Sequence, residues 1–272
     1  KKTLHGRNLR AGEFQFKLTT KPADGSNGTV LQEKQNGADG SIAFDSISYK
    51  TSDTAAGASA VVLDKAVEAG YAVKSTDADG NTEYTLSYRI YEDAENMTNS
   101  NGISVVTGTY DFTVTVTDHG NGVLTAVTNY PEGKNQFEFV NQYGTKPVQI
   151  ELAGSKTLAH DTSLTPADIT GKFTFTLEAL TEGAPMPAQA TAVNDAAGNV
   201  DFGRITFTTD LLQDAITTDS GVRTKEFEYK VTESGSAAGV TNDVNASTGK
   251  TFKLTLTDDG NGNLTVTRNP AD

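Results

Sequence analysis

Short runs of alternating apolar and polar residues fill this chain, and some of them carry one charged or amide residue within an apolar face. Successive side chains on a β-strand point to opposite faces, so residues two apart share a face. One such face consists of Tyr84, Leu86, Tyr88, Ile90 and Glu92. Asn141 shares a face with Phe139, and Lys2 shares one with Leu4. We therefore expect Lys2, Glu92 and Asn141 to point into an apolar core.

The second half of the chain repeats this arrangement. Lys156 belongs to an apolar face that comprises Val148, Ile150, Leu152, Gly154, Lys156 and Leu158. Another face ends in Glu233 and comprises Phe227, Tyr229, Val231 and Glu233. A lone charged group on a core face costs several kcal/mol of folding free energy unless it is paired or neutralised. We therefore expect the buried Lys and the buried Glu of each half to contact each other.

Three segments of the first half recur in the same order in the second half, which indicates a duplicated domain. The matched pairs are Gly12–Leu18 with Gly171–Leu177, Gly40–Tyr49 with Gly198–Phe207, and Thr113–Gly122 with Lys253–Gly262. A chain of 272 residues is long enough for two ordinary domains. We predict that residues 1–145 form the first domain and residues 146–272 the second.

The strand and turn signals predict an all-β protein with two tandem immunoglobulin-like antiparallel β-sandwich domains. The alternating runs are rich in Val, Ile, Thr, Phe and Tyr, and clusters of Gly, Asn and Asp separate them. Asn-Gly pairs within Asp118–Gly122 and Asp258–Gly262 predict two hairpins. Helix is expected to be minor and confined to loops, with one short helix within Ala58–Gly70.

Composition and charge exclude several classes of protein. The formal net charge of −13 argues against nucleic-acid binding, because such binding needs clustered Lys and Arg. The chain has no Cys, so disulfides and thiolate metal sites are impossible. The 3 His residues are not spaced with carboxylates as a metal site or a catalytic triad, and we expect neither a metal nor a cofactor. No signal peptide or transmembrane span is visible, and we expect no membrane contact.

Three parts of the first domain carry a resemblance to a known family: the opening KTLHGRNLRAGEFQFKL, the alternating strand that ends in Glu92, and FVNQY. Together they resemble the isopeptide-linked repeat of streptococcal T-antigen major pilins and related Gram-positive surface proteins. The resemblance implies that a Lys on the first strand and an Asn on the last strand condense inside the core, with a nearby Glu as catalyst. It assigns Lys2 and Asn141 to the cross-link and Glu92 to catalysis. Lys156 and Glu233 are the counterparts in the second domain.

An apolar setting suits this reaction. A lysine amine is nucleophilic only when it is unprotonated, and burial lowers the pKa of an amine and raises that of a carboxyl group. A protonated carboxyl group can then polarise the amide carbonyl and shuttle protons as ammonia leaves. The alternative interpretation is an ordinary buried ion pair of Lys and Glu beside a hydrogen-bonded Asn.

The second domain departs from the pattern at its C-terminal end. Its copy of the hairpin runs to Arg268 and the sequence stops at Asp272, where the first domain still has Pro131–Tyr143 to come. We therefore expect the second domain to lack its last strand. Lys156 and Glu233 should then lie together without a covalent partner in this chain.

Two further residues are candidates for cross-linking. Asn269 is an Asn near the end of the chain and is retained as a partner for Lys156, although alternation places it on the face of Thr267. Lys134 lies in the segment Tyr130–Asn135, just before the strand that bears Asn141. In the pilins that this chain resembles, a sortase can join a lysine at such a place to the next subunit. The alternative for Lys134 is an ordinary solvated loop residue.

The leading functional hypothesis is a structural protein, a shaft segment of a Gram-positive pilus or of a cell-wall-anchored adhesin. Its only chemistry would be one autocatalytic isopeptide bond per domain. The resemblance implies a place outside the cell, on the bacterial surface or in the cell wall, and neighbouring pilin or surface-protein subunits as partners. The alternative is an adhesive module for a host glycan or matrix protein, but Trp is absent and most Tyr and Phe lie on core faces. An enzyme with external substrates is disfavoured, because no acid, base and nucleophile converge in a loop region.

Overall fold

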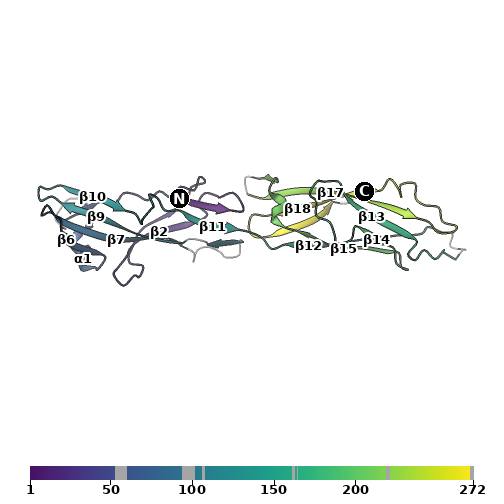
Figure 1. The fold of residues 1–272 in the computed structure, drawn as a ribbon, viewed down its shortest axis with the longest axis horizontal. Coiled ribbons are helices and arrows are strands. Elements are labelled where there is room, and N and C mark those ends of the chain that lie inside the picture. The colour runs from purple at the N-terminus through teal and green to yellow at the C-terminus, as the bar shows by residue number, and fades with distance from the viewer. Residues whose placement is uncertain are drawn as a thin grey trace. The chain divides into compact units, whose positions relative to one another are not determined.

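The computed structural model describes residues 1–52, 60–93, 102–105, 108–160, 163, 165–218 and 221–269. The chain divides into two compact units (Figure 1). The first unit comprises residues 1–99 and 103–143, and the second comprises residues 100–102 and 144–272. The boundary between the two units lies between Tyr143 and Gly144, whereas the sequence predicts a boundary after residue 145. The regular secondary structure of both units is almost entirely β-strand, which confirms the predicted all-β class.

The first unit is a sandwich of two main sheets, and β4 and β5 form a further short parallel pair. One sheet has the strand order β1-β11-β8, and the other has the order β10-β9-β7-β2-β3, with β6 also paired to β7. Buried side chains from both sheets form a single core. The elements are β1 (Lys2–His5), β2 (Gln15–Thr20), β3 (Val30–Gln35), β4 (Tyr49–Lys50), β5 (Val61–Val62), α1 (Leu63–Glu68), β6 (Ala72–Thr76), β7 (Thr82–Glu92), β8 (Ile103–Val105), β9 (Thr109–Asp118), β10 (Leu124–Asn129) and β11 (Phe139–Tyr143).

Strand β7 lies in the middle of the larger sheet and has the alternating pattern that the sequence predicts. It pairs with β9 on one side and with β2 and β6 on the other. Its buried residues are Tyr84, Leu86, Tyr88, Ile90 and Glu92, none of them more than 7% exposed. The predicted core face of this strand is therefore confirmed. Glu92 is its last residue, at the end of an otherwise apolar face.

The first and last strands of the first unit are neighbours, and they run parallel. In their register Lys2 lies opposite Phe139 and Leu4 opposite Asn141. The fold is otherwise largely antiparallel, as the sequence predicts, and this pair is an exception that local patterns do not reveal. Antiparallel strands can be joined by a tight hairpin, whereas parallel neighbours need a long connection. Here the rest of the unit provides that connection.

The second unit repeats much of this plan. Its larger sheet has the order β14-β13-β17-β18-β19, with β16 also paired to β17, and β12 pairs with β15. Among the residues that the structure describes, no strand takes the place that β11 has in the first unit. The elements are β12 (Val148–Ser155), β13 (Phe173–Ala179), β14 (Thr191–Val193), β15 (Asn199–Phe207), the 3₁₀ helix η2 (Thr209–Leu212), β16 (Ile216–Thr217), β17 (Arg223–Gly235), β18 (Lys250–Asp258) and β19 (Leu264–Asn269).

Turns and helix also agree with the sequence. The two Asn-Gly segments connect β9 to β10 and β18 to β19, and both connections are antiparallel hairpins. The short helix expected within Ala58–Gly70 is α1, which buries Leu63 and Ala66. Residues 58–59 of that range lie outside the described part of the chain. Within the described residues, no helix has the length and apolar character needed to cross a membrane.

A buried Asn fixes the start of the second core strand in each unit. Asn36 is 3% exposed. Its Oδ1 accepts a hydrogen bond of 2.8 Å from the backbone N–H of Phe14, and its Nδ2 donates to the carbonyl oxygens of Arg10 and Gly37. Asn194 is 1% exposed and makes the corresponding bond of 3.1 Å to the N–H of Phe173. A buried polar group left without such a partner costs about 1–3 kcal/mol.

We predict that Asn36→Ala lowers the free energy of unfolding of the first unit by about 1–3 kcal/mol, because the buried N–H of Phe14 loses its acceptor. Asn129→Ala is the matched control, since the Asn129 amide binds two Thr hydroxyls on an exposed face. Its effect should stay within about 0.5 kcal/mol. Denaturant unfolding of both variants measures the difference, and equal losses would contradict the structural role of Asn36.

Candidate functional site

The side chains of Lys2, Glu92 and Asn141 meet in the core of the first unit. Lys2 Nζ donates a hydrogen bond of 2.8 Å to Glu92 Oε2, and Asn141 Nδ2 donates one of 2.6 Å to Glu92 Oε1. Lys2 is 1% exposed, Glu92 5% and Asn141 0%. One carboxyl group therefore holds both the amine and the amide, with a separate oxygen for each, in a site closed to solvent.

Three strands from both sheets create this cluster. Lys2 on β1 and Asn141 on β11 point to the same face of neighbouring parallel strands, and their register places them two residues apart. Glu92 comes from the opposite sheet, at the end of β7, where it pairs with Phe16 of β2. The cluster thus forms only when the first strand, the last strand and β7 are all in place.

Aromatic rings surround the amine. Lys2 Nζ lies 4.2 Å from the centre of the Phe14 ring, and the rings of Phe16 and Phe139 pack at a centroid distance of 4.9 Å. Burial in this apolar setting lowers the pKa of the Lys2 amine, although the hydrogen bond and the charge of Glu92 oppose the shift. At a given pH, a larger fraction of this amine is therefore neutral and nucleophilic than in water.

The amide of Asn141 is only half satisfied. Its Oδ1 is buried, and no donor among the described residues reaches it. An unpaired buried carbonyl oxygen is unfavourable. The same atom gains negative charge when a nucleophile attacks the amide, so it is where a proton donor is needed. Half a turn of the amide would direct Oδ1 toward the oxygen of Glu92 that Nδ2 now contacts.

The second unit contains the same Lys and Glu in a more open setting. Lys156 Nζ lies 2.5 Å from Glu233 Oε1 and 4.4 Å from the centre of the Phe173 ring. The side chains of Lys156 and Glu233 are 11% and 13% exposed, whereas those of Lys2 and Glu92 are both 0% exposed. The duplicated pair is thus present, but solvent reaches it.

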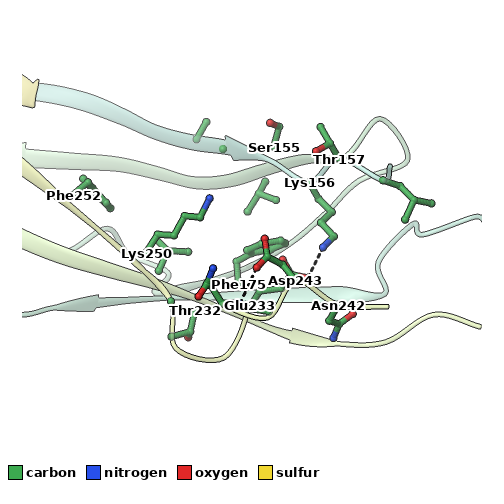
Figure 2. A pocket seen from close by; sticks show the side chains of 18 of the residues that line it. Ser155, Lys156, Thr157, Phe175, Thr232, Glu233, Asn242, Asp243, Lys250 and Phe252 are labelled. Atoms are coloured by element: carbon green, nitrogen blue, oxygen red, sulfur yellow. Dashed lines mark hydrogen bonds and ion pairs between the residues drawn. The ribbon is translucent and has the colours of Figure 1, made fainter. Parts of the chain in front are cut away.

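A groove of about 850 Å³ opens over the second pair. Figure 2 shows Lys156 and Glu233 directed toward each other, with Asn242 and Asp243 nearby. The residues that line the groove come from β12 and the segment 156–159 after it, from β13, β15, β17, β18 and β19, and from the loop before β18. In the first unit, β11 closes the corresponding place.

The structure corrects the candidate pairing of Asn269 with Lys156. Asn269 ends β19 and pairs with Lys253 of β18. Its amide is exposed and donates hydrogen bonds of 3.3 Å to Glu226 Oε1 and to Thr255 Oγ1. Alternation along β19 turns this side chain to the solvent face of the sheet, away from the groove.

Sequence reasoning missed two supporting positions. The backbone N–H of Lys2 donates a hydrogen bond of 2.6 Å to the carbonyl oxygen of Gly40, and Lys156 makes the same bond of 2.7 Å to Gly198. Both glycines have positive φ, and a Cβ on either would overlap the carbonyl oxygen of its lysine. Each opens a matched repeat segment and follows the buried Asn by four residues. Comparison of the two copies could therefore have revealed both positions.

Other candidate positions lie outside this cluster. Lys134 is exposed, and it lies in a turn that its backbone N–H closes on the carbonyl oxygen of Pro131 at 3.0 Å. Its Nζ lies 5.7 Å from the centre of the Tyr110 ring. The described part of the chain contains no group of three His, Asp or Glu side chains that could hold a metal ion.

Comparison with known protein families gives one result. A family model described as FctA, Spy0128-like isopeptide containing domain, matches residues 1–144 and again residues 152–271. The two matches fall on the two units in turn. Domains of this kind are generally non-enzymatic, and they belong to pilins, which are typically surface proteins of Gram-positive bacteria. No curated protein and no solved structure matches the chain.

Proposed function

This chain belongs to the family of Spy0128-like isopeptide-containing domains, and from that premise we propose that it is a structural shaft segment of a Gram-positive pilus or cell-wall-anchored surface adhesin. A self-made isopeptide bond between Lys2 and Asn141 stabilises it. Its place is outside the cell, at the surface or in the cell wall, and its partners are neighbouring pilin or surface-protein subunits. The proposal rests on the buried contact of Lys2 and Asn141 with one carboxyl group, that of Glu92.

The reaction uses protons that the cluster already holds. Transfer of one proton from Lys2 to Glu92 gives a neutral amine and a neutral acid, and burial lowers the pKa of the Lys2 amine, which favours its neutral form. The amine attacks Cγ of Asn141 while Glu92 donates its proton to Oδ1. Glu92 then carries a proton from the attacking nitrogen to Nδ2, and it takes back the proton of Oδ1 as the carbonyl group re-forms. Ammonia leaves, and an Nζ–Cγ bond replaces the Cγ–Nδ2 bond.

Such a bond suits a protein that bears load. It joins β1 to β11, the first and last strands of the unit, so a pulling force passes through a covalent link as well as through the hydrogen-bond ladder. It also closes a long loop in the unfolded chain, as a disulfide does, and this contributes about 5 kcal/mol of stability in the chain-entropy description. The chain has no Cys with which to form a disulfide.

Lys134 is the proposed point of attachment to the next subunit. It is exposed, and its turn leads into β11. A sortase needs a lysine that it can reach, and this position offers one. A subunit joined there would be attached close to the strand that the Lys2–Asn141 bond anchors.

Intact-mass measurement of the purified chain tests the proposal. We expect a mass lower than the sequence mass by one ammonia, because the bond releases one. Lys2→Arg and Asn141→Ala should each restore the full sequence mass. Proteolysis of the unaltered chain should yield one cross-linked fragment that contains both residues. A full sequence mass in the unaltered, folded chain would rule the bond out.

Glu92→Gln should leave the fold intact and block the bond, because glutamine keeps the shape of the side chain but cannot carry the proton. Glu233→Gln is the matched control, since it makes the same change at the equivalent position of the second unit. The control should retain the loss of one ammonia. Circular dichroism checks folding in both variants. Complete cross-linking in Glu92→Gln would refute the catalytic role.

The rate of bond formation should be nearly independent of pH around neutrality. The ion pair and the neutral pair of Lys2 and Glu92 contain the same number of protons, so the reactive form needs no exchange with solvent. An amine that titrates alone would instead react about tenfold faster for each unit by which the pH rises toward its pKa. Refolding of unlinked chain at several pH values, sampled by mass spectrometry, separates the two. A tenfold slope would contradict the shared proton.

A further inference from the structure

Asn-Gly pairs occur in several turns of this chain, and each is a place where the backbone can attack a side chain. The backbone nitrogen of the Gly reaches Cγ of the preceding Asn, because Gly has no side chain to hinder the approach. The attack needs an amide that is free to turn and a backbone N–H that no acceptor holds. The structure describes four such pairs, at residues 27–28, 36–37, 121–122 and 261–262, while the first residue of the pair 101–102 lies outside the described part.

Two of these pairs have a glycine N–H that is already engaged. The N–H of Gly37 donates a hydrogen bond of 2.8 Å to the carbonyl oxygen of Ser41, and that of Gly28 donates one of 2.9 Å to the carbonyl oxygen of Thr20. The amide of Asn36 is also buried, and both of its polar atoms are bonded. These hydrogen bonds must break before the nitrogen can attack, so the folded chain protects both pairs.

The hairpin between β18 and β19 is held by the carboxyl group of Asp259. Its Oδ1 accepts hydrogen bonds of 2.7 Å and 3.1 Å from the N–H groups of Asn261 and Asn263, and its Oδ2 accepts one of 2.7 Å from Asn263 Nδ2. Asn261 Nδ2 donates a hydrogen bond of 3.2 Å to the backbone carbonyl oxygen of Asp259. The nitrogen that would have to leave is therefore tied to the loop.

The hairpin between β9 and β10 lacks this carboxyl group. The two hairpins read DHGNGV and DDGNGN, so His119 stands in place of Asp259 and Val123 in place of Asn263. Nε2 of His119 lies 3.0 Å from Oγ1 of Thr125, outside the turn itself. The duplicated hairpins thus share an Asn-Gly pair but differ in the group that holds it.

The amide of Asn121 is exposed, and its nitrogen has no hydrogen-bond partner among the described residues. Its Oδ1 accepts a hydrogen bond of 3.1 Å from the N–H of Val123. This donor stabilises the negative charge that Oδ1 gains when the amide carbon is attacked. Within the same part of the chain, the N–H of Gly122 has no acceptor. Of the four described pairs, this one alone combines a free amide nitrogen with a free glycine N–H.

We propose that Asn121 is a site of spontaneous modification, at which the folded chain converts the amide into a carboxylate. The nitrogen of Gly122 attacks Cγ of Asn121, an N–Cγ bond forms, and the Cγ–Nδ2 bond breaks. Nδ2 leaves as ammonia with the proton that the glycine nitrogen gives up, and a succinimide ring remains. One water molecule then opens the ring. The product is aspartate or isoaspartate, which adds a negative charge to the turn and, as isoaspartate, one more carbon atom to the main chain.

This loss of ammonia differs from the one proposed for the bond between Lys2 and Asn141. The ring opens again in water, so the final chain is heavier than the unmodified chain by one water minus one ammonia. An isopeptide bond keeps its mass deficit. The two reactions use different residues, and each can occur without the other. A mass deficit that survives prolonged incubation therefore reports the isopeptide bond, and a slow gain of mass reports the modification.

Hydroxylamine tests the proposal, because it opens the succinimide and cuts the chain between the Asn and the Gly. We expect the folded chain to be cut at residues 121–122 about tenfold faster than at residues 27–28, 36–37 or 261–262. A tenfold difference corresponds to about 1.4 kcal/mol in the barrier, which is the size of one hydrogen bond that must first break. The unfolded chain should be cut at all of these pairs at similar rates. Equal rates in the folded chain would overturn the proposal.

Exchange of the hairpin residues supplies matched variants. His119→Asp combined with Val123→Asn gives the first hairpin the letters of the second and should slow cleavage there about tenfold, while Asp259→His combined with Asn263→Val should accelerate it in the second hairpin. Asn121→Gln should abolish cleavage at its position, because glutamine would have to form a larger ring. Circular dichroism checks that each variant is folded. Cleavage rates that stay unchanged in both folded exchange variants would refute the role of the hairpin hydrogen bonds.

Discussion

A pair of opposite charges buried in an apolar core is the constraint on which the first unit depends. Removal of two ions from water costs several kcal/mol for each, and their attraction offsets this only when the geometry is good and the remaining polar atoms are satisfied. Lys2 and Glu92 meet at 2.8 Å, and Asn141 occupies the second carboxyl oxygen. Because the three side chains come from β1, β7 and β11, the pair can be satisfied only if both sheets are correctly assembled. On the proposed chemistry, the amide bond then removes the charge of the lysine altogether.

The duplication offers an internal comparison that isolates the effect of one strand. Both units place a Lys beside a Glu and over a Phe ring. They differ in β11, which closes the cluster of the first unit, while the second unit has an open groove instead. The Lys and the Glu therefore find each other without the last strand. What the strand adds is the amide, the aromatic cover and the exclusion of water.

Alternation in the sequence predicts which side chains point inward, but it does not predict which strands are neighbours. The period of two is a local property, so the face of β7 up to Glu92 could be read directly. The parallel pairing of β1 with β11 depends on the packing of the whole unit, and no local pattern encodes it. The roles of Asn36 and Gly40 were not predicted from the sequence for another reason. A side chain that binds backbone groups and a residue without a side chain produce no periodic signal, so only their repetition in the second copy marks them.

The separation of the three residues along the chain determines when they can meet. Lys2 is on the first strand of its unit, Asn141 is on the last, and Glu92 lies between them. Closure of such long loops costs entropy that other native contacts must first offset, so these contacts form late in folding. An unfolded or partly assembled chain does not bring the amine to the amide. On the proposed chemistry, ammonia is released only from a unit that has folded. Loss of the ammonia then makes an otherwise reversible folding reaction irreversible.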